Sequence, residues 1–183
     1  MKGKRWTHEL ILTWFLLLSM QPLQPLQGMD PDPEITGRVI AELIEALSVE
    51  EASPLNFGRF FIDGQGGGTI TITASPVVDR LAAGNAVHLA SGGNPGPAVY
   101  QVMGHPQASV NITPPEPALL MHATNPAYRM VVAEWTYFPP GAAKLDANGK
   151  LTFYIGATLH VESLAMNPVG IYSGTYNVTF AYD

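Results

Sequence analysis

Residues 171–183 read I-Y-S-G-T-Y-N-V-T-F-A-Y-D, and this stretch decides the fold class of the chain. Aromatic and apolar side chains take every second position, and small or hydroxylated ones lie between them. Because successive side chains of a β-strand point to opposite faces, the alternation predicts a strand with one buried aromatic face. That face needs partner strands and a facing sheet to cover it, so we expect a sheet protein. The residues expected to face inward are Tyr172, Gly174, Tyr176, Val178, Phe180 and Tyr182.

The same signals recur towards the N-terminus. Residues 151–161 and 130–138 are long runs rich in apolar and β-branched residues, and residues 69–74 alternate, with Ile70 and Ile72 inward. Turns rich in glycine, proline or asparagine separate such runs, at residues 63–68, 91–96, 114–117, 139–141 and 145–150. Strand signals at intervals of roughly ten to twenty residues, with no helical pattern between them, are typical of an antiparallel β-sandwich. We therefore predict an all-β protein.

The composition limits the size and the chemistry of this protein. Its 183 residues, 46% hydrophobic and 13% charged, suffice for one core, and we predict a single domain over residues 38–183. The chain contains no cysteine, which excludes disulfides and thiolate chemistry. A formal net charge of −6 and scattered Lys and Arg residues argue against a nucleic-acid partner, because affinity for phosphate backbones rests on clustered basic side chains.

The N-terminal residues predict export. Lys2, Lys4 and Arg5 precede an apolar run at residues 10–20, as in a signal peptide, and we assign residues 1–28 to this signal. No small-x-small cleavage pattern stands at residues 21–28, so an uncleaved membrane anchor is the alternative. Residues 29–37, with two prolines and three acidic residues, predict a linker. We expect a cell-surface or extracellular protein that meets a membrane only through its N-terminal segment.

Residues 38–52 fit two patterns. Apolar residues recur at helical spacing, but one strand parity is also apolar, and it consists of Val39, Ala41, Leu43, Leu47 and Val49. We predict a first strand, with a helix as the alternative, because the rest of the chain is all-β. If this strand packs in its own sandwich, the protein is a monomer. If it is donated to another copy, the protein is a polymerising subunit, and the sequence leaves both arrangements open.

No catalytic, metal or cofactor site is predicted. The histidines are single and have no metal-ligand spacing, at His88, His105, His122 and His160. A secreted hydrolase would need two converging carboxylates among Asp63, Asp79, Glu116, Glu134, Asp146 and Glu162, a pattern so loose that turn and surface roles explain these acids better. Asp146 with Asn148 and Gly149 predicts a turn, and Trp135 and Tyr137 share a parity that predicts core packing.

Six motifs in a fixed order resemble one protein family. They are L-N-F-G at 55–58, G-T-I-T-I at 68–72, Y-Q-V-M-G at 100–104, L-D-x-x-G at 145–149, I-G-A-T-L-H-V at 155–161 and G-I-Y-S-G-T-Y-N-V-T at 170–179. Residues 39–183 thereby resemble DUF4402, a family of bacterial exported β-sandwich domains that is similar to pilin subunits and spore-coat-U-type domains. The resemblance implies an immunoglobulin-like (pilin-like) sandwich without assigned enzymatic activity. It also implies structural roles for Asn56, Phe57, Gly58, Gly156, Tyr172, Gly174 and Tyr176.

These observations predict a non-enzymatic structural or adhesive protein of the cell surface. Its expected partners are copies of itself or other surface subunits, joined by strand donation, and no cofactor is expected. The alternative is a secreted module that binds a carbohydrate or another ligand, with contact loops at residues 91–97 and 114–126. A secreted hydrolase is the third hypothesis.

Overall fold

The computed structural model describes residues 38–64 and 66–183, and the signal and linker predictions for residues 1–37 lie outside this part of the chain. A boundary between two compact units follows Ala41. Residues 38–41 are exposed without regular structure, and the thirteen strands of the described residues lie in 42–183. The described residues contain no helix, and so none that is long and apolar enough to span a bilayer. The prediction of an all-β protein is confirmed.

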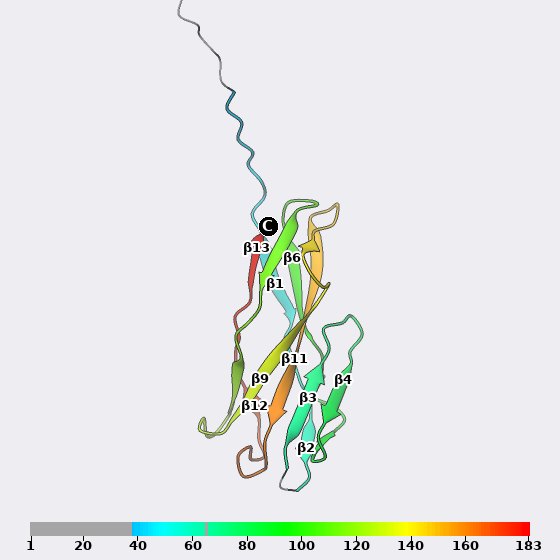
Figure 1. Ribbon diagram of the computed structural model, residues 1–183, viewed down its shortest axis with the longest axis vertical. Coiled ribbons are helices and arrows are strands. Elements are labelled where there is room, and N and C mark those ends of the chain that lie inside the picture. Colours follow the sequence, from blue (N-terminus) through cyan, green and yellow to red (C-terminus); the bar gives the residue numbers. More distant parts are fainter. Residues whose placement is uncertain (1–37, 65) are drawn as a thin grey trace, which may run out of the picture. The chain divides into compact units, whose positions relative to one another are not determined.

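Three antiparallel sheets build the folded unit (Figure 1). The largest has the order β1-β6-β11-β9-β8-β12, with β3 paired to β11 and β4 paired to β3. Its strands are β1 (Ser48–Ser53), β3 (Gly68–Ile72), β4 (Arg80–Ala83), β6 (Ala98–Met103), β8 (Ala118–His122), β9 (Arg129–Phe138), β11 (Lys150–Val161) and β12 (Tyr172–Ser173). The second sheet has the order β10-β7-β13, from β7 (Ser109–Thr113), β10 (Ala143–Lys144) and β13 (Thr179–Tyr182), and the third pairs β2 (Phe60–Ile62) with β5 (Val87–Leu89).

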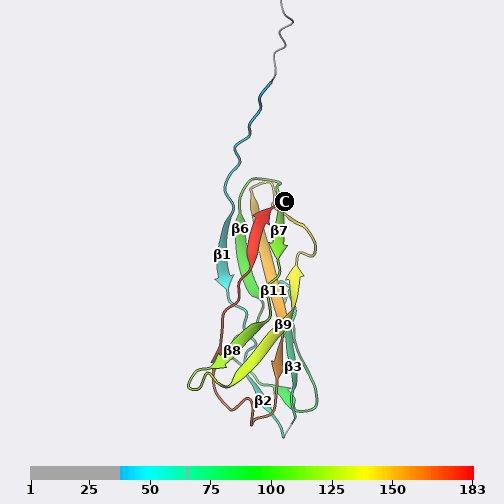
Figure 2. The same cartoon turned by 60° about the vertical axis from the view of Figure 1, so that its left-hand side comes forward.

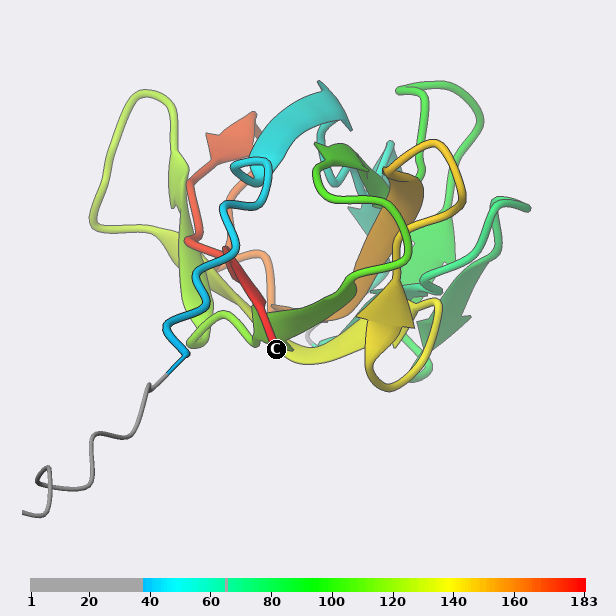
Figure 3. The same cartoon turned by 90° about the horizontal axis from the view of Figure 1, so that it is seen from above.

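The central strand of the large sheet is β11. Its first half pairs with β6 and its second half with β3, while β9 runs along its other side. Seen from above, the large sheet curls around an interior that side chains fill (Figure 3). The inward side chains of β11 are almost fully buried, as expected for a strand with partners on both sides, and they include Phe153, Ile155, Ala157 and Leu159.

A bulge in β9 changes which of its side chains face inward. Between Gly156 and Thr158, β11 has one residue, whereas β9 has two residues between the partners of these two. One of the two is Glu134, which takes a φ of 54°. Such an insertion reverses the strand's parity. Met130 and Val132 are therefore inward before the bulge, whereas Trp135 and Tyr137 pack on the core after it. The predicted core packing of these two aromatic residues is confirmed.

Apart from Gly174, which is exposed, the predicted inward positions of the C-terminal stretch are half-buried, but the stretch is not one strand. Tyr172 packs on one core cluster, Phe180 and Tyr182 pack on the other, and Tyr176 packs on both. The single strand predicted there is wrong, because β12 pairs with the end of β8 and β13 pairs with β7 in a different sheet. Residues 174–178 connect the two sheets without strand structure. The alternation therefore continues while the pairing partner changes.

The predicted first strand begins later than expected. Strand β1 starts at Ser48, which pairs with Met103 at the end of β6. Within the part of the chain that the structure describes, residues 38–47 have no strand partner and form neither strand nor helix. The assignment of Val39, Ala41, Leu43 and Leu47 to this strand is therefore wrong, although Leu47 packs on a core cluster. Val49 lies partly exposed in β1.

Two core clusters lie along the sheet, and their coverage differs. The cluster around Phe153 and Val110 is faced by the three-stranded sheet, which makes this half a two-layer sandwich. The cluster around Ile70 and Leu159 is faced by the short β2–β5 pair and by irregular segments. Figure 2 shows β2 and β3 at the end opposite to β1 and β6. The second layer is thus incomplete over the second cluster.

Candidate functional site

A cleft of about 870 Å³ lies over the less covered core cluster. One wall is residues 54–62, which lead from β1 into β2, and the other is residues 167–176, which include β12. The floor consists of apolar side chains of the large sheet, namely Ala118, Leu120, Met130, Val132 and Leu159, with Trp135 beside them. A ligand in this cleft would therefore rest directly on the core.

The first wall is held by one asparagine and one arginine. Asn56 pairs with Gly96 through both backbone groups at 2.9 Å, and its Oδ1 accepts the N–H of Gly58 at 2.8 Å. Gly58 has a φ of 72°, a conformation that favours glycine. The Arg80 guanidinium donates to the carbonyls of Phe57, at 3.0 Å, and Ala90, at 2.9 Å. These bonds fix the backbone behind the cleft.

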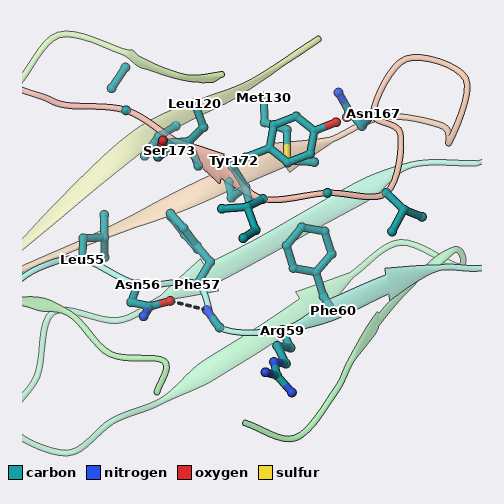
Figure 4. A pocket seen from close by; sticks show the side chains of 18 of the residues that line it. Leu55, Asn56, Phe57, Arg59, Phe60, Leu120, Met130, Asn167, Tyr172 and Ser173 are labelled. Carbon is teal, nitrogen blue, oxygen red and sulfur yellow. Dashed lines mark hydrogen bonds between the residues drawn. The ribbon is translucent and has the colours of Figure 1, made fainter. Parts of the chain in front are cut away.

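Side chains of the first wall point towards the second. Figure 4 shows Phe57 and Phe60 extending towards Tyr172, while Arg59 points away from the cleft. Phe57 is buried, with 7% of its surface exposed, and Phe60 packs on the same core cluster. Among the described lining residues Arg59 alone is charged. The interior of the cleft is therefore apolar and aromatic.

The second wall is held by a buried asparagine. Asn167 is 2% exposed, its Oδ1 accepts the N–H of Glu162 at 2.6 Å, and its Nδ2 donates to the carbonyl of Arg129 at 2.8 Å. The Tyr172 hydroxyl donates to the carbonyl of Pro168 at 2.8 Å, and partial burial raises the pKa of this hydroxyl. Its ring lies edge-on to that of His122, with centroids 5.0 Å apart. The wall is thus tied to the large sheet at its start.

Beyond β12 the second wall loses its backbone partners. Within the described residues, the backbone groups of 174–178 make no hydrogen bond to other backbone groups, although Tyr176 and Val178 are half-buried. Among the described residues, the contacts that hold Tyr176 are made by its side chain. Its hydroxyl lies 2.9 Å from that of Tyr100, and its ring lies 4.7 Å from that of Trp135. Burial raises the pKa of both hydroxyls, so both tyrosines are neutral at physiological pH.

The histidines and acids considered for catalysis do not converge in this cleft. His88 Nε2 lies 4.0 Å from Asp63 Oδ2, and His160 Nε2 lies 3.6 Å from Glu134 Oε1. Both pairs are exposed on the surface. In residues 38–64 and 66–183 no group of three or more His, Cys, Asp or Glu side chains is placed to hold a metal ion. None of the six acids lines the cleft. Its chemistry is that of a binding site for apolar groups.

Asp146 occupies a turn, as predicted. Its Oδ1 accepts the N–H groups of Asn148 and Lys150, both at 2.8 Å. These two bonds lower the pKa of its carboxyl. Gly149 takes a φ of 70° in the same turn, so the local hydrogen bonds explain this acidic residue without a bound cation.

The structure brings most of the motif residues together at the cleft. Six of the seven line it, namely Asn56, Phe57, Gly58, Tyr172, Gly174 and Tyr176. Gly156 lies elsewhere, in β11, where an added Cβ would collide with the carbonyl of Ile72. Of the two predicted contact loops, residues 114–126 contribute Ala118 and Leu120, and residues 91–97 contribute nothing. Asn167 was not predicted, because no local pattern marks it.

One comparison with known proteins identifies the family. A family model described as "Domain of unknown function (DUF4402)" matches residues 47–182, which is most of the chain. No curated protein and no solved structure matches. The resemblance inferred from the motifs is confirmed, and the chain belongs to the DUF4402 family.

Proposed function

We propose that this DUF4402 protein is a non-enzymatic, exported structural or adhesive component of the cell surface, and that it is a pilin-like subunit assembled by strand donation. The observation that carries the proposal is the apolar segment 38–44. Val39 is 98% exposed, Ile40 85% and Leu43 100%. Isolated apolar side chains on a surface need no explanation, but several exposed apolar side chains so close together, here on both sides of Glu42, mark an interaction site.

The energy of burial supports a strand as the form in which the segment binds. Burying a Val, Ile or Leu side chain contributes about 1.5–3 kcal/mol. A strand buries one face, so Val39 and Leu43 together would contribute about 3–6 kcal/mol. Association costs about 4–15 kcal/mol. Side-chain burial alone therefore covers only the lower end of this cost, and backbone pairing with an open sheet edge adds to it.

Other features agree with a structural role. The basic and apolar start of the chain supports export. The cleft lined by the motif residues has an apolar interior without acidic side chains among the described residues, which fits binding better than hydrolysis. The motif resemblance to pilin subunits and the DUF4402 membership support the same class of protein.

The alternative is a secreted module that binds a carbohydrate or another small ligand. Its support is the size of the cleft, since about 870 Å³ falls within the range of about 300–1,000 Å³ that is usual for small-molecule sites. Aromatic residues such as Trp135 and Tyr172 line it. A glycan array separates the two functions, because binding by a monomeric chain would favour this alternative.

The assembly proposal is tested by light scattering behind size exclusion. The chain from residue 29 is compared with a chain that starts at Leu47, which keeps β1 intact. We expect oligomers for the longer chain and a folded monomer for the shorter one, with the same circular dichroism. A longer chain that stays monomeric at every concentration would contradict the proposed function.

A further inference from the structure

We propose that the cleft between residues 54–62 and 167–176 is the acceptor for segment 38–44 of a second copy. The donated segment would lie as an extended strand beside residues 174–178, with Val39, Ala41 and Leu43 towards the apolar floor. This inference rests on the proposed function, because it names the partner surface for the donated strand. It joins two features that have no strand partner among the described residues, the edge at residues 174–178 and segment 38–44.

The open edge supplies the backbone partners. Residues 174–178 have no regular structure and make no backbone hydrogen bond within the described chain, and Tyr176 and Val178 are half-buried. Gly174, Thr175 and Tyr176 also line the cleft, so a strand added along this edge would lie over it. Five residues of strand span about 17 Å, and the seven residues of 38–44 span about 23 Å. The segment is long enough to pair along the whole edge.

The side-chain patterns of the segment and the cleft match. One parity of the segment is Val39, Ala41 and Leu43, and the other carries Glu42 between Ile40 and Ile44. With the first parity inward, only apolar groups meet the floor, and Glu42 points to solvent. The opposite orientation would bury the Glu42 carboxylate in the cleft. Among the described lining residues only Arg59 is charged, and it points away from the cleft, so the carboxylate would have no partner there. The pattern therefore selects one face of the donated strand.

The position of the cleft favours a second copy over the same chain. Strand β1 begins at Ser48, beside Met103, and the cleft begins at Pro54, beyond the other end of β1. A six-residue strand is about 20 Å long. The chain just before β1 is held in place, because Tyr182 Oη donates to the Glu45 carbonyl at 2.7 Å and Leu47 packs on the core. The segment would have to reverse at these anchored residues to reach its own cleft.

A donor at one end of the sheet and an acceptor at the other give head-to-tail assembly. The contact joins different surfaces of the two copies, so each copy keeps one free donor and one free acceptor at the ends of the assembly. Unless a rotation closes a ring, such a contact continues as a filament. The expected product is therefore a ladder of oligomers and not a single dimer.

Disulfide cross-linking tests this inference, because the chain has no cysteine of its own. A Glu42→Cys chain is produced in the same cells as a Thr175→Cys or an Asn177→Cys chain, so that assembly follows synthesis of both. The three positions are exposed in the monomer and would point outward on neighbouring strands of the assembly. An Asn148→Cys chain, changed at an exposed turn outside the cleft, is the matched control. After oxidation with diamide, we expect a cross-linked pair from Glu42→Cys with at least one cleft-edge position, and none with Asn148→Cys.

The outcomes separate the two proposals. If the unmodified chain forms oligomers but neither cleft-edge position cross-links above the Asn148→Cys control, the acceptor assignment is overturned and the assembly proposal stands. If the unmodified chain is a monomer and no cross-link forms, both are overturned. A cross-link that forms within one chain carrying both cysteines at high dilution would show that the segment fills its own cleft, and it would overturn donation to a second copy.

Discussion

Gly156→Ala is predicted to destabilise the sandwich at its centre. Gly156 lies in the middle of β11, and an added Cβ would meet the carbonyl of Ile72, the backbone nitrogen of Ala74 at 2.5 Å and Thr136 Oγ1 at 2.8 Å. Backbone atoms of neighbouring strands cannot rotate away, so the strands must separate. Overpacking of a core costs about 1–3 kcal/mol, and a collision with backbone belongs at the upper end. For a chain of this size, 3 kcal/mol lowers the Tm by about 6–12 °C.

The matched control is Gly96→Ala. At Gly96 an added Cβ would find only Val78 Cγ2, at 3.7 Å, which is ordinary contact, and its φ is not positive. Replacing such a glycine restricts the unfolded chain and stabilises by about 0.4–1 kcal/mol. Urea unfolding followed by circular dichroism gives both free energies. Equal stability of Gly156→Ala and Gly96→Ala would refute the close packing of β3, β9 and β11 at Gly156.

Three further predictions concern single side chains. Asn56→Ala leaves the Gly58 N–H without its acceptor, and urea unfolding should show a loss of about 1–3 kcal/mol. Burial raises the pKa of Tyr176, so the unfolded chain releases this proton above about pH 10 while the folded chain keeps it. Stability should therefore fall as the pH rises above that value, and less steeply in Tyr176→Phe; equal slopes would contradict the burial of this hydroxyl. The pKa of Asp146 is lowered in the folded chain, so its carboxylate contributes stability above the ordinary pKa, and this contribution is lost as the pH falls through the pKa of the folded chain. Urea unfolding at several acidic pH values should therefore show a weaker pH dependence for Asp146→Asn.

Alternation in the sequence predicted which side chains are buried better than which strands pair. The inward positions of residues 172–182 are those of the alternating pattern except Gly174, which is exposed, and residues 174–178 leave the sheet. A side-chain pattern reports the face that is covered, and it does not report the strand that lies alongside. The change from β8 to β7 as partner therefore had no signal in the sequence.

The bulge at Glu134 illustrates a second limit. Parity in residues 130–138 reverses at one extra residue, whose φ of 54° is set by pairing with β11. Only the partner strand, with one residue opposite two, defines the bulge. The start of β1 at Ser48 is likewise set by its partner strand, because Ser48 pairs with Met103, the last residue of β6.

The candidate site was predicted only in pieces. The motifs pointed to Asn56 and Tyr172 separately. They did not show that the two residues lie on facing walls of one cleft, because these walls are more than a hundred residues apart in the chain. Floor residues such as Leu120 and Met130 look like any core residue, and their access to the cleft depends on the incomplete second layer. Asn167 is a single polar residue whose burial follows from its bonds to Glu162 and Arg129.

The most direct test of assembly by strand donation is the solution mass of Leu43→Asp beside that of Ile44→Asp, by light scattering on the chain from residue 29. Both side chains are exposed, so neither change should affect the fold. The account predicts that Leu43→Asp, which would place a carboxylate on the cleft floor, is a monomer, and that Ile44→Asp still forms oligomers. Oligomers of equal mass from both variants, or monomers from both, would contradict it.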